Sequence, residues 1–188
     1  FPFMSNLSTS WGFVLRDNAT AETVNVRVKV PTTIQQWLPL RSGVPAGERC
    51  CISLHEVVRH NAYKLFPGVT IEHAMLFRLS RNADIAIEED RDNSIRELVE
   101  EHVRQRRFQP VVRLEFDESP HAEIRHGLMD QFELRDSDIY ELPGLLDYTT
   151  LFGIASLPEA QLRDPPWTPM VPLGLDPEAD LFAVIRAG

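Results

Sequence analysis

Alternating apolar and polar residues predict a β-hairpin near the start of the chain. Between Val24 and Val30 every second residue is valine, with polar residues between the valines. This period of two is typical of a strand with one buried face. The apolar run Trp11–Leu15 comes before it, and the polar residues 16–18 lie between the two runs. We therefore expect two antiparallel strands over residues 11–30.

Four shorter segments have the composition of strands. They are Arg49–Ile52, Met75–Ser80, Pro110–Phe116 and Asp138–Leu142. The alternation in the third segment predicts two different faces. One face would carry Val112, Leu114 and Phe116, and the other Val111, Arg113 and Glu115.

Capping residues and apolar spacing predict helices between these strands. Ser53, followed three residues later by Glu56, has the pattern of a capping box, and the apolar spacing that follows predicts a helix over 54–66. Ser119 as the cap and Pro120 at the first helical position predict another helix, which ends near Phe132. A further helix is expected near 148–156. Together with the strands, these helices predict an α+β fold with a mixed β-sheet and packed helices.

The most charged helix is expected between the predicted strands Met75–Ser80 and Pro110–Phe116. Ser94 and Glu97 form a second capping-box pattern, and one apolar stripe follows it. Carboxylates come before this helix and arginines end it, an order that complements the helix dipole. The carboxylates are Asp84, Glu88, Glu89, Asp90 and Asp92.

Proline marks the C-terminal part of the chain. Six of the 14 prolines fall between Pro158 and Pro177, too many for a helix or a central strand. We expect a core over 1–157 and an extended segment over 158–188, with a short helix or strand at 181–185. The chain starts at Phe1 rather than methionine, so we expect it to be a segment of a longer protein.

Composition limits the kind of partner. Hydrophobic residues make up 43% and charged residues 25% of the 188 residues, which is typical of a globular protein. The formal charge of −9 argues against a protein whose main role is to coat nucleic acid or an anionic membrane. The sequence has no apolar run long enough to span a membrane and no signal-peptide pattern. We therefore expect a cytoplasmic protein with no nucleic-acid partner.

Several catalytic and metal-binding patterns are incomplete. His55, Glu56 and His60 are spaced HExxxH, one residue longer than the zinc-binding HExxH, so we expect two exposed helix histidines. Cys50 and Cys51 are adjacent, which favours two reduced thiols over a disulfide or a CxxC site. No phosphate-binding P-loop or GxSxG elbow is present. The acidic cluster has neither the ligand spacing nor the glycine of an EF-hand, so a solvated helix start is favoured over a metal site.

Arginines on or beside the predicted strands indicate a different chemistry. They are Arg78, Arg81, Arg104, Arg106, Arg107 and Arg113. If the end of the charged helix lies beside the next strand, these side chains form a local cationic surface. Surface salt bridges to the many carboxylates are the alternative.

Longer runs of sequence resemble a known family. They are FPFMSNLS at 1–8, RNAD at 81–84, RRF at 106–108, PVVRLE at 110–115, PPWTP at 165–169 and DLFAVIR at 180–186. In this order they resemble the middle, or head, domain of the bacterial polyphosphate kinase that works through a phosphohistidine. Gln109 stands where the family often has glycine, and residues 32–50 match only loosely.

The resemblance implies a fold, an activity and a location for the catalytic residues. The fold would be similar to the phosphohistidine-phosphatase-like α+β group. The parent enzyme would transfer the terminal phosphoryl of ATP to inorganic polyphosphate, reversibly. The catalytic histidine, ATP and Mg²⁺ would lie outside this segment, which would contribute no catalytic, cofactor-binding or metal-binding residues.

For the segment itself, the resemblance implies contacts with other domains of the same polypeptide, with a second subunit and with a polyphosphate tunnel. Arg81, Arg106, Arg107 and Arg113 are the candidate polyphosphate contacts. The alternative is a free-standing, noncatalytic module for dimerisation or polyanion binding.

Overall fold

The computed structural model describes residues 3–82, 108–117, 120–170 and 180–187. The chain divides into two compact units, residues 1–156 and 157–188. The strands are β1 (Thr9–Asp17), β2 (Thr23–Lys29), β3 (Trp37–Pro39), β4 (Cys51–Ser53), β5 (Val69–Arg81), β6 (Val111–Phe116) and β7 (Ile139–Glu141). The α-helices are α1 (Leu54–His60), α2 (Ala62–Leu65), α4 (Ala122–Phe132), α5 (Phe152–Ala155) and α6 (Leu181–Ala187). The 3₁₀ helices are η2 (Asp136–Asp138), η3 (Tyr148–Leu151) and η4 (Ala160–Leu162).

A five-stranded mixed sheet organises the first unit. Its strand order is β2-β1-β5-β6-β7, and β3 and β4 form a separate pair. The pairs along the large sheet are antiparallel except for β6 and β7, which are parallel. Helix α4 lies between β6 and β7 in the chain, as parallel neighbours require a crossover. This architecture confirms the predicted α+β fold.

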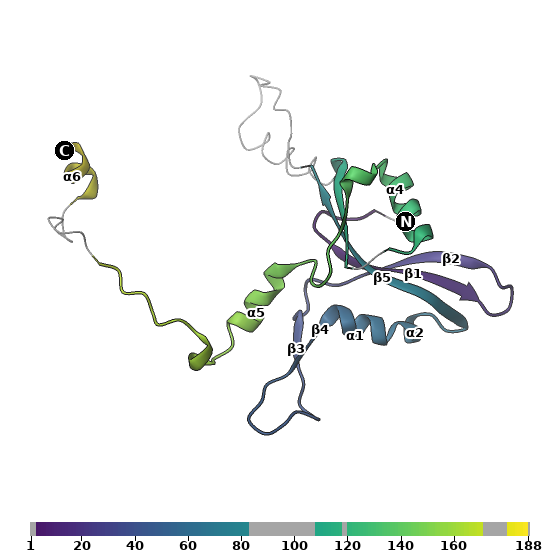
Figure 1. Ribbon diagram of the computed structural model, residues 1–188, viewed down its shortest axis with the longest axis horizontal. Coiled ribbons are helices and arrows are strands. Elements are labelled where there is room, and N and C mark those ends of the chain that lie inside the picture. Colours follow the sequence, from purple (N-terminus) through teal and green to yellow (C-terminus); the bar gives the residue numbers. More distant parts are fainter. Residues whose placement is uncertain (1–2, 83–107, 118–119, 171–179, 188) are drawn as a thin grey trace, which may run out of the picture. The chain divides into compact units, whose positions relative to one another are not determined.

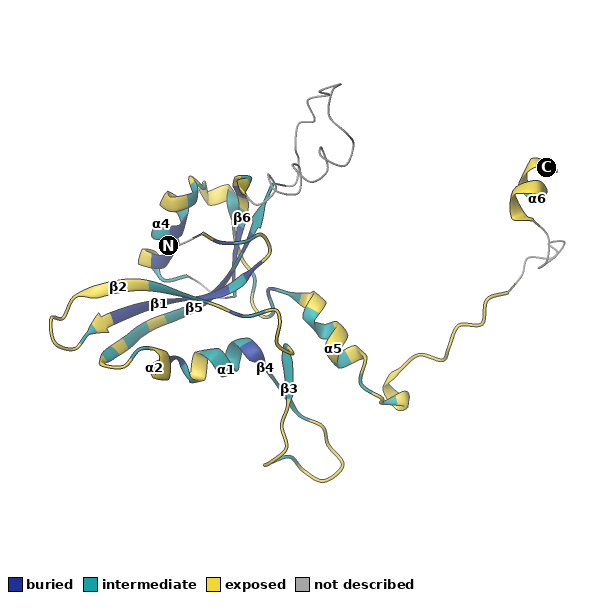
Figure 2. Cartoon of the chain, turned by 180° about the vertical axis from the view of Figure 1, so that it is seen from behind, coloured by how far each residue is buried: buried dark blue, intermediate teal, exposed yellow. Residues whose placement is uncertain are grey.

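The two faces of the sheet carry separate cores. Figure 1 shows α4 on one face and α1 and α2 on the other. On the α4 face, the core contains Met4, Val14, Met75, Phe77, Leu79, Val111, Leu114, Phe116, Ile124 and Leu128. On the α1 face, it contains Trp11, Phe13, Leu15, Val30, Leu54, Ala62, Leu76 and Leu146. Strand β1 supplies both cores and is buried along Ser10–Leu15, whereas the edge strand β2 is largely exposed (Figure 2).

The predicted hairpin is confirmed, with longer strands than the pattern indicates. Trp11 pairs with Val28 and Leu15 with Val24, so the alternation of the valines sets the register. Residues 16 and 17, predicted in the turn, still belong to β1. Strand β5 is also longer than predicted, with 13 residues. Strand β3 was not predicted, and it pairs Trp37 with Ser53.

The predicted faces of β6 are wrong at its start. Ser80 pairs with Arg113 and Arg81 with Val111, so Val112 is an extra residue in a β-bulge. The bulge turns Val111 into the α4-side core, at 6% exposure, and leaves Val112 48% exposed. Beyond the bulge, Leu114 and Phe116 are buried on that same face, as the alternation predicts.

Two predicted helix starts need correction. Ser53 precedes α1 but makes no capping hydrogen bond, because its hydroxyl lies 3.1 Å from Nε2 of His55. Helix α4 follows His121 and begins at Ala122, so Pro120 is not its first helical residue. Ser119 lies outside the described residues.

The predicted helix over 54–66 is interrupted at Asn61. Its φ of −106° is not helical, and both its backbone N–H and its side-chain amide donate to the carbonyl of Val57. The backbone bond follows the helical i→i−4 pattern, whereas the side-chain amide competes for the same carbonyl. With this non-helical φ, α1 ends at His60, and α2 begins at Ala62.

The C-terminal predictions agree with the structure where it describes them, except that the predicted extended segment contains the 3₁₀ helix η4 at Ala160–Leu162. Helix α5 and the preceding η3 together cover 148–155. Within the second unit, residues 163–170 have no regular secondary structure, and the short run at 181–185 is helical, in α6. The predicted charged helix, with Ser94, Glu97, Arg104 and the acidic cluster, lies outside the described residues.

Candidate functional site

Arg81, a predicted polyphosphate contact, holds the N-terminal segment to the sheet. Its Nε and Nη2 donate to the carbonyl oxygen of Met4 at 3.1 and 2.8 Å, and Nη1 donates to that of Gln109 at 2.7 Å. The guanidinium carbon also lies 5.2 Å from the ring centre of Phe3 and 5.8 Å from that of Phe132. Burial lowers the pKa of this guanidinium. Arg81 therefore connects three segments of the chain through their backbones and rings.

Arg78 lies three residues earlier on β5, in a buried ionic cluster. Its Nη1 lies 3.6 Å from Oε2 of Glu115, and its Nη2 lies 3.8 Å from Oδ1 of Asp147. Nη1 also donates to the carbonyl of Leu146, and Nε donates to that of Leu7. The side chains of Arg78 and Glu115 are only 16% and 8% exposed. This arginine connects β5 and β6 to the segment that precedes η3.

Arg113 extends the same cluster toward solvent. Its Nε donates to Oε1 of Glu115 at 2.7 Å, and its guanidinium lies 4.0 Å above the ring centre of Tyr140. The side chain is 40% exposed. Because Arg113 pairs opposite Ser80, it lies on the α1 face of the sheet. Arg81 reaches Met4, a residue of the α4-side core, so the two arginines lie on opposite faces. Arg104, Arg106 and Arg107 lie outside the described residues.

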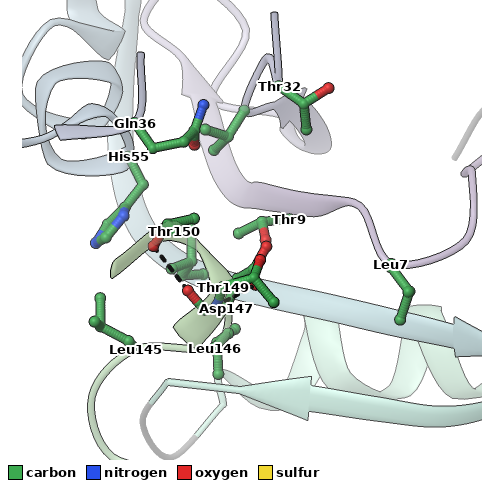
Figure 3. A pocket seen from close by; sticks show the side chains of 12 residues that line it. Leu7, Thr9, Thr32, Gln36, His55, Leu145, Leu146, Asp147, Thr149 and Thr150 are labelled. Carbon is green, nitrogen blue, oxygen red and sulfur yellow. Dashed lines mark hydrogen bonds between the residues drawn. The ribbon is translucent and has the colours of Figure 1, made fainter. Parts of the chain in front are cut away.

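A pocket of about 280 Å³ opens on the α1 face of the sheet, next to the ionic cluster. Figure 3 shows side chains from several segments around it. Its apolar lining comes from Leu7, Val30, Leu76, Leu145 and Leu146, and its polar lining from Thr9, Thr32, Gln36, His55, Asp147, Thr149 and Thr150.

Asp147 organises one wall of the pocket. Its Oδ1 accepts hydrogen bonds from the backbone N–H and the hydroxyl of Thr149, and its carbonyl accepts one from the hydroxyl of Thr150. The first bond makes Asp147 the N-cap of η3. Trp37 in turn donates from Nε1 to the hydroxyl of Thr150 at 3.3 Å, joining β3 to this wall.

His55 also lines the pocket and is not the exposed histidine that its position in the pattern predicts. Its side chain is 23% exposed, and its ring lies 6.5 Å from that of Trp11. Trp11, itself buried, donates from Nε1 to the backbone carbonyl of His55. Burial lowers the pKa of the imidazole, and the nearby carboxylate of Glu56 partly offsets this. His60 is exposed, as predicted.

Metal-binding chemistry has little support in the described part of the chain. No group of three or more histidine, cysteine, aspartate or glutamate side chains there is arranged to hold a metal ion. Glu56 lies near both His55 and His60, at 3.9 and 3.5 Å, but in the manner of ion pairs. Cys50 and Cys51 are both free thiols, as expected. No described helix has the length and apolar character needed to cross a membrane.

Most residues of the pocket were not singled out from the sequence. Thr9, Thr32 and Asp147 come from segments far apart in the chain and carry no motif spacing. A local signal does exist at Asp147, because aspartate two residues before Thr149 is the pattern of an N-cap. That signal predicts the start of a helix but not the pocket beside it.

Comparisons with known proteins agree with the predicted resemblance. Residues 1–154 match the family model of the polyphosphate kinase middle domain. The chain is 40% identical over 179 residues to a polyphosphate kinase of Synechocystis sp., covering 92% of this chain and 25% of that protein. It is 37% identical over 175 residues to a polyphosphate kinase of Thermosynechococcus vestitus, covering 92% of this chain and 24% of that protein.

A solved structure has the same fold. The crystal structure of polyphosphate kinase from Porphyromonas gingivalis matches with a TM-score of 0.64 over 90% of this chain and 23% of that chain, at 13% identity. The chain thus spans about a quarter of the length of the relatives it matches. From the match over residues 1–154, the chain belongs to the polyphosphate kinase middle-domain family.

Proposed function

We propose that this chain is the middle, or head, domain of a longer polyphosphate kinase. The parent enzyme would move the terminal phosphoryl group of ATP to inorganic polyphosphate through a phosphohistidine, and would run in reverse to make ATP. The observation that supports this best is the match to the middle-domain model over residues 1–154. The relatives named polyphosphate kinase, about four times as long as this chain, support it further.

Within that enzyme, we propose a structural role for this domain. It would contribute contacts to a second subunit and walls to a polyphosphate tunnel, and the catalytic residues would lie in other domains of the same polypeptide. Residues 1–157 would form the head domain, and 158–188 would lead to the catalytic part. The cytoplasmic location remains a prediction from the sequence.

The described residues do not fit ATP phosphates or Mg²⁺. The pocket has no lysine or arginine in its lining, and the guanidinium of Arg78 beside it is already paired with Glu115 and Asp147. No described cluster has the carboxylates that Mg²⁺ prefers. In line with the resemblance, we propose that both groups bind outside this segment, and we assign no step of the reaction to its residues.

Polyphosphate contact by Arg81, Arg106, Arg107 and Arg113 also remains a proposal. Of the two candidates that the structure describes, Arg113 supports it better than Arg81, because its side chain is 40% exposed. Arg81 contributes first to the fold, through its three hydrogen bonds to backbone carbonyls. A test of polyanion binding should therefore leave Arg81 unchanged.

The activity is tested in the full-length gene product. Incubation with ATP labelled at the γ-phosphate and Mg²⁺ should yield an acid-insoluble phosphate polymer, and ADP with that polymer should yield ATP. A full-length protein that is folded but makes no polymer would overturn the proposal. Replacement of this segment by the middle domain of the Synechocystis relative should preserve synthesis, which checks that the segment acts as that domain.

A free-standing module for dimerisation or polyanion binding is the alternative. The two proposals differ in the length of the native protein and in the need for other domains. Peptide mapping of the native gene product past Gly188 separates them. A continuation that contains catalytic histidines supports the kinase, and a native C-terminus near Gly188 supports the module.

A further inference from the structure

The pocket on the α1 face has the size of a site for a small ligand. Its volume of about 280 Å³ lies just below the roughly 300–1,000 Å³ of common ligand sites. Apolar side chains of Val30, Leu76 and Leu146 provide part of its surface. Leu76 and Leu146 are only 2% and 5% exposed and belong to the core, whereas Leu7, at 49% exposure, offers a ligand more apolar surface. A flat or aliphatic ligand body would fit against such a surface.

The charges of the pocket favour an uncharged ligand. Asp147 is the one carboxylate in the lining, and Nη2 of Arg78 lies 3.8 Å from it. Its Oδ1 already accepts two hydrogen bonds from Thr149. The imidazole of His55 is partly buried, and burial lowers its pKa, which favours the neutral form near pH 7. The pocket lining therefore offers no unpaired charge that would bind an anion or a cation.

Polar groups remain for hydrogen bonds to such a ligand. The hydroxyls of Thr9 and Thr32 make no hydrogen bond to any other described residue. Gln36 uses its amide nitrogen to bind the carbonyls of Pro31 and Ile34, which directs its amide oxygen elsewhere. The two hydroxyls can donate and accept hydrogen bonds, whereas the amide oxygen of Gln36 can only accept them.

Leu7 adds a strained position to the pocket lining. Its φ of 56° lies in the left-handed region, which is uncommon for leucine. Hydrogen bonds from Leu7 to the carbonyl of Leu79, and from Arg78 to the carbonyl of Leu7, hold this conformation. The side chain lines the pocket, yet is 49% exposed. Strain of this kind gathers at ligand-binding sites more often than elsewhere.

We propose that this pocket binds a small uncharged molecule with the chemistry of a nucleoside, in which a flat base contacts the leucines and hydroxyl and ring-nitrogen groups bond to the threonines and Gln36. The lining has no lysine or arginine to pair with a phosphate group, so we expect a nucleoside to bind more tightly than its monophosphate. The inference rests on the pocket alone and holds whether or not the parent protein is a kinase.

Calorimetric titration of the 188-residue chain tests this proposal. The probes are adenosine, guanosine, cytidine and uridine, with ribose and adenosine monophosphate for comparison. We expect at least one nucleoside to bind with a dissociation constant on the order of 1 mM or below. We expect ribose and the monophosphate to bind about tenfold more weakly or not at all.

Two neighbouring threonines provide a matched pair of variants. Thr32 lines the pocket and Thr33 does not, and both are exposed. Thr32→Phe should fill the pocket and weaken binding about tenfold, whereas Thr33→Phe should change it less than about twofold. Thermal unfolding of both variants checks that they are folded.

Four results would contradict parts or all of this proposal. Absence of nucleoside binding up to the solubility limit overturns the proposal. Ribose binding as tight as nucleoside binding refutes the role of the base, and equal binding of the monophosphate refutes the preference for an uncharged ligand. Equal loss in the two threonine variants places the binding outside this pocket.

Discussion

The guanidinium of Arg81 donates two hydrogen bonds to one atom, the backbone carbonyl oxygen of Met4. Met4 is fully buried against α4, so its carbonyl has little access to water as an alternative partner. The backbone N–H of Arg81 completes the connection by donating to the side chain of Asn6. Residues 77 positions apart in sequence are therefore held together by one side chain.

Loss of this contact should destabilise the domain. For Arg81→Gln we expect the free energy of unfolding to fall by about 2–3 kcal/mol, because hydrogen bonds from a charged donor to buried carbonyls are lost. Urea unfolding followed by circular dichroism measures the change. Arg16→Gln is the control, since Arg16 is half exposed and its ion pair with Glu72 should contribute about 1 kcal/mol or less. Equal effects of the two substitutions would contradict the role assigned to Arg81.

Gly12 on β1 provides a second prediction, about close packing. A Cβ at this position would lie 3.2 Å from Cγ2 of Ile124 and 3.5 Å from Phe77. Ile124 is fully buried and β-branched, so it has little freedom to move away. We expect Gly12→Ala to lower the free energy of unfolding by about 1–3 kcal/mol.

Gly127 is the matched control for that substitution. It lies within α4, and an added Cβ would meet no atom within 4 Å. Gly127→Ala should therefore raise stability by about 0.5–1 kcal/mol, because alanine favours the helix. The two variants should shift the thermal transition in opposite directions. A stabilised Gly12→Ala protein would show that α4 is packed more loosely on β1 than the distances indicate.

The buried pair of Arg78 and Glu115 should be sensitive to the loss of one partner. Arg78→Met removes the cation that lies beside both Glu115 and Asp147 and leaves Glu115 with Arg113 as its remaining partner. We expect a loss of about 3 kcal/mol, because one cation of a largely buried ionic cluster is lost. Adding Glu115→Gln removes that charge and should recover part of the loss. A double-mutant cycle in urea measures the coupling. Strictly additive effects would argue against an interaction between these two side chains.

Acid should weaken the domain through His55. Burial lowers the pKa of His55 in the folded protein below the ordinary value of 6.5, while the unfolded chain keeps the ordinary value. Below that value the unfolded state takes up a proton that the folded state does not bind, so stability falls as the pH falls from 6.5 toward the folded pKa. His55→Gln should therefore lose less thermal stability than the parent chain between about pH 7.5 and 5.5. The exposed His60 provides the control, His60→Gln, and an unchanged pH profile in His55→Gln would contradict the prediction.

Polyanion binding should depend on the candidate arginines other than Arg81. The triple variant Arg106→Gln, Arg107→Gln and Arg113→Gln should bind polyphosphate more weakly, with a flatter dependence of affinity on salt, because fewer counterions are released. Fluorescence anisotropy of a labelled polyphosphate at several salt concentrations measures the slope. An unchanged slope, with an intact thermal transition, would assign these side chains to salt bridges.

Local sequence patterns predicted the parts of the fold that depend on local preference. The period of two at Val24–Val30 predicted β2 correctly, because one face of that strand meets a core and the other meets solvent. The apolar spacing after residue 53 predicted helix, but not the interruption at Asn61, where φ is not helical and the side-chain amide binds the carbonyl of Val57. In β6, the bulge at Val112 reversed the face of Val111, since the register depends on the neighbouring strand.

The sequence by itself determined the family, the α+β class and the order of most elements, because long ordered motifs and periodic burial can be read along one chain. Only the tertiary structure decided what the chemically active side chains do. Arg81 and Arg113 lie on the neighbouring strands β5 and β6, but on opposite faces of the sheet, and they have different partners. The pocket joins Thr9, His55 and Asp147 from distant segments, and such a meeting depends on how β1, α1 and η3 pack together. Packing of this kind is set by contacts between segments far apart in sequence, and no local pattern records it.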